Sequence, residues 1–313
     1  MAAHTLLNAF KTNTPAFGTW LTIGGFVHAR SVARALVGLP QKQSWIMLDC
    51  EHGLLPLHPS GATEVIAAIH GVRDGPSALV RIPATGHGTG SGSEGVNWQI
   101  KYALDSGARG VLVPMVSTPS QAQEVVISSR FPPQGRRGFG SSYTQENWDI
   151  QTAGEYLNVA NESVIVLVQI ETREGVQNVK AIAEVDGIGK YQNSRFIELV
   201  QVAESPELLC SHADGLFIGP YDLSNALGYP PPSPDPHPEV EKVIQDILRV
   251  AHEAGKKWYV GCRAFHWHTL AFVMRFGFLI VLPPAFPNYS AMYCISGAQA
   301  ARRAAEGFDM VSR

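Results

Sequence analysis

The chain has 313 residues, of which 45% are hydrophobic and 16% charged, and its formal net charge at pH 7 is −3. This length and apolar content suffice for one large α/β domain with a substantial core, or for two small domains. The small net charge gives no sign of nucleic acid or of an anionic membrane surface as a partner.

Short apolar runs alternate with segments of helical spacing along the chain. Strands are predicted at 17–23, 45–48, 78–83, 110–116, 164–170 and 215–220. Helices are predicted at 3–11, 28–37, 62–70, 98–106, 119–128, 155–161, 175–184 and 239–254. Strands that alternate with helices indicate a parallel sheet, and six such units favour a (β/α)8 TIM barrel. A doubly wound sheet is the alternative, although no GxGxxG motif follows the first strand.

The most informative run is 164–168, where five apolar residues, four of them β-branched, lead into Gln169 and Glu171. A run of this kind is typical of a strand that is buried on both faces. Glu171 then lies at the carboxyl end of the strand, where α/β barrels place their chemistry. A carboxylate there needs a partner, which is either a divalent cation or an arginine at the rim.

Polar residues also follow other predicted strands, and in a barrel all of them converge on one face. They are Asp49, Glu51, His52, Arg81, Gln169, Glu171 and Asp222. Two carboxylates can hold a hard divalent cation with positions left for a 2-oxo acid. Arg81 offers a planar fork for a carboxylate or enolate oxygen, and His52 is a general base near neutral pH. The alternatives are a structural ion pair for Arg81 and a helix cap for Asp222.

Several long motifs occur in order along the chain. They are LDCEHG (48–53), VRIP (80–83), ALDSGARGVLVPMV (103–116), FPPQGRRGFG (131–140), VLVQIETREGVQN (166–178) and LFIGPYDLS (216–224). Over nearly its whole length the sequence resembles the HpcH/HpaI aldolase family of metal-dependent class II pyruvate aldolases. That family includes 2-dehydro-3-deoxyglucarate aldolase and 4-hydroxy-2-oxoheptanedioate aldolase.

The resemblance implies a role for each matching residue. Glu171 and Asp222 would bind Mg2+, Mn2+ or Co2+, and Arg81 would contact the pyruvyl group and its enolate. His52 would be the acid/base, supported by Asp105, while Asp49 would help to arrange the site. The 2-oxo acid pocket would be lined by Gln169, Gly219, Pro220 and Tyr221.

The implied reaction splits a 4-hydroxy-2-oxo acid into pyruvate and an aldehyde, both small molecules, through an enolate. One alternative is decarboxylation of oxaloacetate, as in the related macrophomate synthase. A second is an inactive product of a disrupted gene model. The resemblance also implies a homo-hexamer of chains that each fold as one (β/α)8 domain, here residues 1–313.

The sequence departs from the family pattern in three places. Extra segments interrupt it at 189–213 and 258–290, and the chain ends at 307–313 without the final helix that packs against a neighbouring subunit in the family. We interpret the two segments as translated introns or gene-model errors, because codons at their edges can carry splice-site sequences. Genuine surface insertions are the alternative. The missing helix puts the oligomer in doubt.

Four scattered cysteines, Cys50, Cys210, Cys262 and Cys294, lack CxxC spacing. This pattern indicates reduced thiols, not a disulfide framework or a zinc site. The first residues show neither a long apolar core nor a cleavage-site pattern, so no signal peptide is expected. A cytoplasmic enzyme is therefore the expectation.

Overall fold

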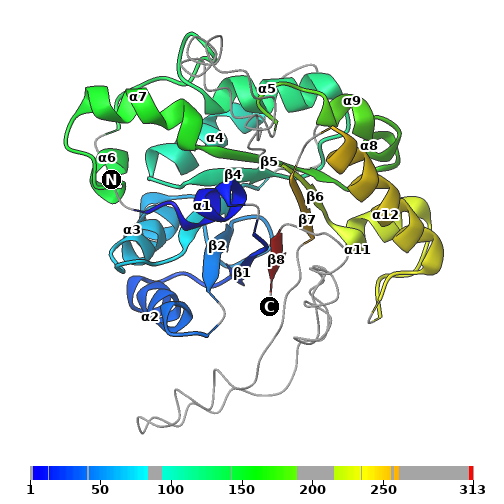
Figure 1. Ribbon diagram of the computed structural model, residues 1–313, viewed down its shortest axis with the longest axis horizontal. Coiled ribbons are helices and arrows are strands. Elements are labelled where there is room, and N and C mark those ends of the chain that lie inside the picture. Colours follow the sequence, from blue (N-terminus) through cyan, green and yellow to red (C-terminus); the bar gives the residue numbers. More distant parts are fainter. Residues whose placement is uncertain are drawn as a thin grey trace, which may run out of the picture.

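The computed structural model describes residues 3–12, 14–40, 42–83, 94–141, 143–188, 215–233, 235–254, 257–260 and 310–312. A curled sheet of parallel strands lies at its centre, with helices around it (Figure 1). The sheet is formed by β1 (Ala16–Leu21), β2 (Gln43–Asp49), β3 (Ser77–Arg81), β4 (Gly110–Val113), β5 (Ile165–Ile170) and β6 (Gly215–Ile218). The shorter strands β7 (Lys257–Val260) and β8 (Met310–Ser312) pair in parallel between β6 and β1, which closes the ring.

The strands are ordered in space as they are along the chain. The prediction of an α/β fold with a parallel sheet is therefore confirmed. A doubly wound sheet would need a reversal of strand order, so that alternative is wrong. Helices after β7 and β8 would fall outside the described residues, and the eightfold repeat stays a prediction.

The structure describes a short part of one extra segment and no part of the other. The 189–213 segment lies outside the described residues, as does most of 258–290. However, residues 258–260 belong to β7, where they pair with β6. These residues extend the sheet, and both segments stay predictions as insertions.

The helices are α1 (Thr5–Lys11), α2 (Phe26–Val37), η1 (Pro59–Thr63), α3 (Glu64–His70), α4 (Glu94–Asp105), α5 (Pro119–Ser129), α6 (Tyr143–Asn147), α7 (Ala153–Ser163), α8 (Arg173–Gln177), α9 (Val179–Ala183), α11 (Pro220–Leu227) and α12 (Pro238–Glu253). Capping boxes start α5 at Thr118 and α7 at Thr152. The predicted helix 175–184 is instead two short helices divided at Asn178. Within the described residues, no helix is long and apolar enough to cross a membrane.

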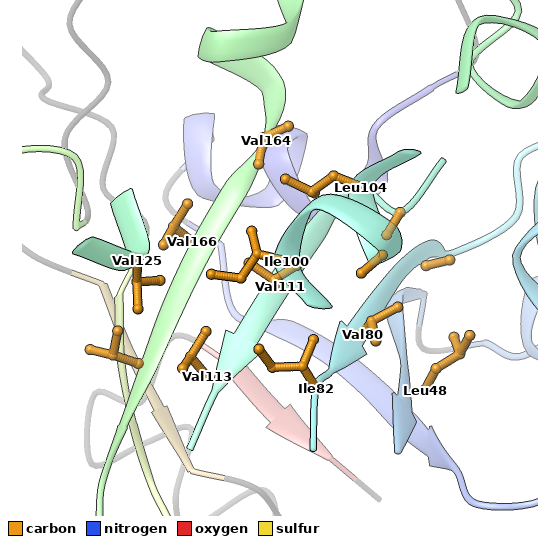
Figure 2. Close-up of a cluster of buried hydrophobic side chains, with 14 of the residues drawn as sticks. Leu48, Val80, Ile82, Ile100, Leu104, Val111, Val113, Val125, Val164 and Val166 are labelled. Carbon is orange, nitrogen blue, oxygen red and sulfur yellow. The ribbon is translucent and has the colours of Figure 1, made fainter. Parts of the chain in front are cut away.

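Side chains of each central strand alternate between two hydrophobic clusters. Outward-facing Leu48, Val80 and Val166 pack beneath helices, against residues such as Ile100 and Leu104 of α4 (Figure 2). The inward-facing cluster contains Trp45, Met47, Leu79, Leu112, Leu167 and Phe217, together with Leu6 and Phe10 of α1. Burial on both faces explains the uninterrupted apolar runs of the sequence.

Helix α1 covers the amino end of the strands. The Thr5 hydroxyl donates a hydrogen bond of 2.7 Å to the Ser44 carbonyl, and it lies 3.1 Å from the hydroxyl of Ser77. These contacts fix α1 at the starts of β2 and β3. The polar residues at the opposite, carboxyl ends are left to form a site.

Strand β4 ends earlier than the sequence predicts, at Val113 instead of Val116. Pro114 has no N–H to donate to a neighbouring strand. Met115 then adopts a φ of +60°, which turns the chain out of the sheet.

Candidate active site

Four polar residues at the carboxyl ends of neighbouring strands are almost completely buried. Asp49 and Arg81 are register partners at the ends of β2 and β3, with exposures of 2% and 3%. Gln169 lies near the end of β5 and Glu171 directly beyond it, with exposures of 1% and 3%. The predicted convergence of these side chains follows from the parallel strand order.

Arg81 and Asp49 form a bidentate ion pair. Arg81 Nε donates to Asp49 Oδ1 at 3.0 Å, and Nη2 donates to Oδ2 at 2.7 Å. The Trp20 ring lies against the guanidinium, 4.5 Å from its carbon, and meets Phe217 edge-on. Burial alone would raise the pKa of Asp49, but Arg81 lowers it below the ordinary value. The guanidinium is therefore held rigidly, and the ion pair that was an alternative for Arg81 is present.

Asp49 also shapes the turn that follows β2. Its Oδ1 accepts hydrogen bonds from the backbone N–H groups of Glu51 and His52, at 3.2 and 3.1 Å. Glu51 Oε2 lies 3.4 Å from Arg81 Nε and 3.6 Å from His52 Nε2. Half of the His52 side chain is exposed, so the imidazole stands at the open side of the buried pair.

Glu171 is oriented by two donors. Its Oε1 accepts from Gln169 Nε2 at 2.8 Å, and its Oε2 accepts from the backbone N–H of Met115 at 3.1 Å. Burial, with smaller contributions from Asp222 and Glu51, raises the pKa of Glu171 to about 8. Burial likewise raises the pKa of Glu51 to about 7. Arg81 offsets only part of the effect of burial at both carboxylates.

Buried carboxylates that Arg81 offsets only in part fit a hard divalent cation with oxygen ligands. Gln169 Oε1 is buried and has no hydrogen-bond partner among the described residues. The absence of a side chain at Gly219 makes room for the Glu171 carboxylate, since a Cβ there would lie 1.8 Å from Glu171 Oε1. No group of three His, Cys, Asp or Glu side chains with metal-ligand geometry occurs in the described part of the chain. A cation would therefore need ligands beyond these carboxylates.

Comparison with known proteins decides which family has this arrangement. A family profile for HpcH/HpaI aldolase/citrate lyase matches residues 26–261. The 4-hydroxy-2-oxo-heptane-1,7-dioate aldolase of Salmonella typhimurium is 33% identical over 251 residues, which are 80% of this chain and 76% of that protein. The chain belongs to the HpcH/HpaI aldolase/citrate lyase family. It is therefore an aldolase-type enzyme, a lyase.

Solved structures share the fold of this HpcH/HpaI family member. A family protein from Burkholderia cenocepacia J2315 has a TM-score of 0.65 at 24% identity, over 99% of this chain and 92% of that one. Macrophomate synthase has a TM-score of 0.64 at 19% identity, over 99% and 83%. At these identities the similarity supports the fold alone.

In this HpcH/HpaI chain the remaining predicted pocket residues lie where β6 passes into α11. Gly219 is the N-cap of α11, which therefore begins without a capping side chain. Pro220 follows in a buried position, Tyr221 is half-buried and Asp222 is exposed. The interpretation of Asp222 as a helix cap is wrong, because it lies inside the first turn.

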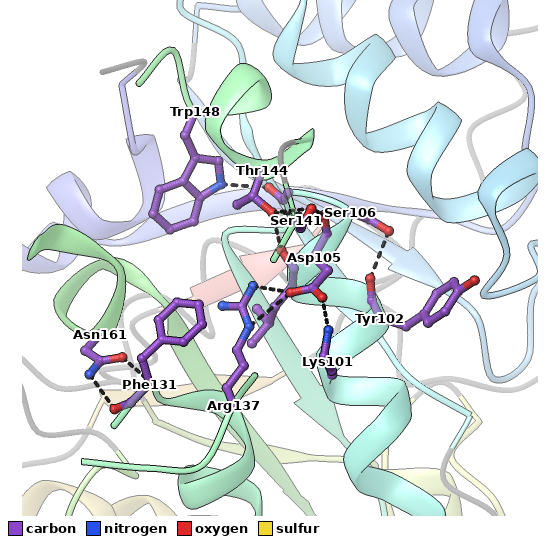
Figure 3. Close-up of polar contacts among 12 residues, drawn as sticks. Lys101, Tyr102, Asp105, Ser106, Phe131, Arg137, Ser141, Thr144, Trp148 and Asn161 are labelled. Carbon is purple, nitrogen blue, oxygen red and sulfur yellow. Dashed lines mark hydrogen bonds and ion pairs between the residues drawn. The ribbon is translucent and has the colours of Figure 1, made fainter. Parts of the chain in front are cut away.

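Asp105 is not brought together with His52. It ends α4, where its carboxylate accepts from Arg137 Nη2 at 2.8 Å and pairs with Lys101 (Figure 3). Ser141 and Thr144 donate to its backbone carbonyl. Within the described chain Asp105 therefore anchors the loop after α5, and the carboxylate beside His52 is that of Glu51.

Three residues contribute to the site although the sequence offered no reason to assign them a role in it. Trp20 lies inside a predicted strand, where an aromatic residue is expected for packing alone. Glu51 was noted beside His52 but received no role. Met115 contributes through its backbone, for which a methionine gives no sequence signal.

Proposed function

We propose that the chain is a class II pyruvate aldolase that cleaves a 4-hydroxy-2-oxo acid to pyruvate and an aldehyde. One observation carries the proposal: at the carboxyl ends of parallel strands, a guanidinium fixed by Asp49 lies close to the further carboxylates of Glu51 and the buried Glu171. This pairing suits an anionic substrate and a cation together. The relatives named 4-hydroxy-2-oxo-heptane-1,7-dioate aldolase support the same substrate class.

Glu171 and Asp222 would hold a divalent cation, Mg2+, Mn2+ or Co2+, which when bound supplies Lewis-acid stabilisation of negative charge. Arg81 binds the 2-oxo acid and stabilises the oxygen that becomes anionic. Its pairing with Asp49 and stacking on Trp20 orient that charge before the substrate arrives. Gln169 and the 219–221 segment line the pocket.

His52 accepts the proton of the substrate's 4-hydroxyl group. The bond between C3 and C4 then breaks, C4 becomes the aldehyde carbonyl, and the electron pair moves into the pyruvate enolate. Protonation of C3 completes the reaction and restores the base. Half of the His52 side chain is exposed, which allows proton exchange with solvent.

The fold and assembly around this site complete the proposal. We infer a full (β/α)8 barrel in one domain and a homo-oligomer. Oxaloacetate decarboxylation would use the same residues, so the assay has to separate the two activities.

The decisive experiment measures pyruvate release from 4-hydroxy-2-oxoheptanedioate, coupled to lactate dehydrogenase, with Mn2+ and with EDTA. We expect EDTA-sensitive turnover that is lost in Arg81→Ala. Arg249→Ala is the matched control, because Arg249 lies on the exposed face of α12 and, in the part of the chain that the structure describes, forms its ion pairs with neighbours on its own helix. Turnover of oxaloacetate without cleavage of the hydroxy acid, or equal activity in both variants, would contradict the proposal.

A further inference from the structure

The chain leaves β4 through a residue in an unusual backbone conformation. Met115 has a φ of +60°, the left-handed region that residues other than Gly, Asn and Asp rarely enter. Conformations of this kind persist where the surrounding structure holds them, and they cluster at functional sites. Met115 follows the end of β4 and contacts Glu171 just beyond the end of β5. These contacts indicate the role of the conformation.

The left-handed turn directs two consecutive N–H groups at the end of β5. Met115 N donates to Glu171 Oε2 at 3.1 Å, and Val116 N donates to the Gln169 carbonyl at 3.2 Å. Successive N–H groups around a left-handed residue form a concave donor site for an anion or a carbonyl. Here that donor site receives one carboxylate oxygen and one carbonyl oxygen of the same strand.

Further contacts hold this turn in place. The Ser117 hydroxyl lies 2.7 Å from the Thr172 hydroxyl, and Asn178 Nδ2 donates to the Ser117 carbonyl at 2.9 Å. Gly175 allows close approach, since a Cβ there would lie 3.0 Å from the Val116 carbonyl. The 115–117 segment is thereby held against the 172–178 segment, which directly follows the end of β5.

Glu171 needs both of its donors to keep one orientation. Gln169 Nε2 holds Oε1, while the Met115 N–H holds Oε2. A carboxylate with only one of these contacts could rotate about its terminal bond. Donors that orient a metal-ligating carboxylate tune its affinity for the metal.

We propose that Met115 is a positioning residue whose left-handed backbone, not its side chain, orients the Glu171 carboxylate for a divalent cation. The inference rests on the proposed function, because Glu171 is assigned there as a ligand. It adds the requirement that residue 115 must tolerate a positive φ.

The test compares Mn2+ affinity, measured by calorimetry, and thermal stability of the metal-free protein in four variants. Met115→Val and Met115→Leu are matched apolar changes, but only valine is β-branched and strongly disfavours a positive φ. We expect Met115→Val to weaken Mn2+ binding about 10- to 100-fold, the usual effect of losing an orienting contact. Met115→Leu, Met115→Gly and Met115→Asn should bind as tightly as the wild type.

Unchanged Mn2+ affinity in Met115→Val, even with lowered thermal stability, would overturn the inference and indicate a purely structural role. Equal losses in all four variants would overturn it too, since the side chain would then matter. If Met115→Val cannot be purified, the β-branched Met115→Thr takes its place with the same expected loss, and unchanged Mn2+ affinity there refutes the inference. A tenfold loss in Met115→Gly or Met115→Asn refutes it as well. Glu171→Gln tests the proposed function separately: unchanged Mn2+ binding there would remove Glu171 as a ligand.

Discussion

Gly219 offers the most direct test of how closely the site is packed. A Cβ at this position would lie 1.8 Å from Glu171 Oε1 and 3.1 Å from Gln169 Nε2, and real Cβ contacts under 3.0 Å essentially never occur. Gly219→Ala must therefore displace the carboxylate by more than about 1 Å, a shift that can reduce catalysis roughly 10²-fold. We expect that loss in kcat/KM, equivalent to about 2.7 kcal/mol of transition-state stabilisation.

The assay is pyruvate release in the presence of Mn2+, with circular dichroism as a check on folding. The control is Gly154→Ala in α7, where a Cβ would meet no atom within 4 Å. That variant should keep full activity and gain about 0.5–1 kcal/mol in unfolding free energy. Wild-type kcat/KM in a folded Gly219→Ala protein would refute the packing argument and the placement of Glu171 in the site.

Three further predictions concern stability. Asp49→Asn removes the bidentate partner of the buried Arg81, which keeps a longer contact of 3.4 Å with Glu51. Urea unfolding should therefore show a loss of about 3 kcal/mol, and an unchanged value would contradict the role of the pair. Thr144→Val removes a buried hydroxyl that donates to two carbonyls at the end of α4, at 3.1 and 2.9 Å. It should lower the unfolding free energy by about 1–3 kcal/mol with kcat/KM unchanged, and a loss of activity would link that region to the site. Burial, with a smaller contribution from Arg109, lowers the pKa of His70 from 6.5 to about 3. As the pH falls, His70 therefore takes up a proton at a higher pH in the unfolded chain than in the folded chain. The stability that is present above pH 6.5 is lost as the pH falls below that value. His70→Leu should flatten this acid dependence by up to about 1.4 kcal/mol per pH unit, and parallel curves would contradict the burial of the ring.

The fold was predictable where strands that are buried on both faces have long apolar runs in the sequence. Strands β2 and β5 are buried on both faces, and their unbroken apolar runs place them within two residues of their observed bounds. The end of β4 was not predictable from hydrophobicity, because Val116 is apolar and buried although it lies beyond the strand. The strand ends before Val116 because Pro114 lacks an N–H and Met115 adopts a positive φ.

The site was predictable to the extent that it follows from strand ends. Asp49, Arg81, Gln169 and Glu171 converge because parallel strands bring their carboxyl ends together. The partner of His52 was not predictable in this way. The carboxylate of Asp105 pairs with Lys101 of the same helix and with Arg137, and the contact with Arg137 depends on how α4 packs against the segment after α5.

The several hydrogen bonds of Asp49 limit how this enzyme could be evolved. One carboxylate fixes Arg81 and also builds the turn that presents Glu51 and His52. In the proposed mechanism, a substitution there would therefore change substrate recognition and proton transfer together. Directed evolution of the proposed activity should instead vary exposed residues of the segment after β2, such as Leu54, which is 83% exposed.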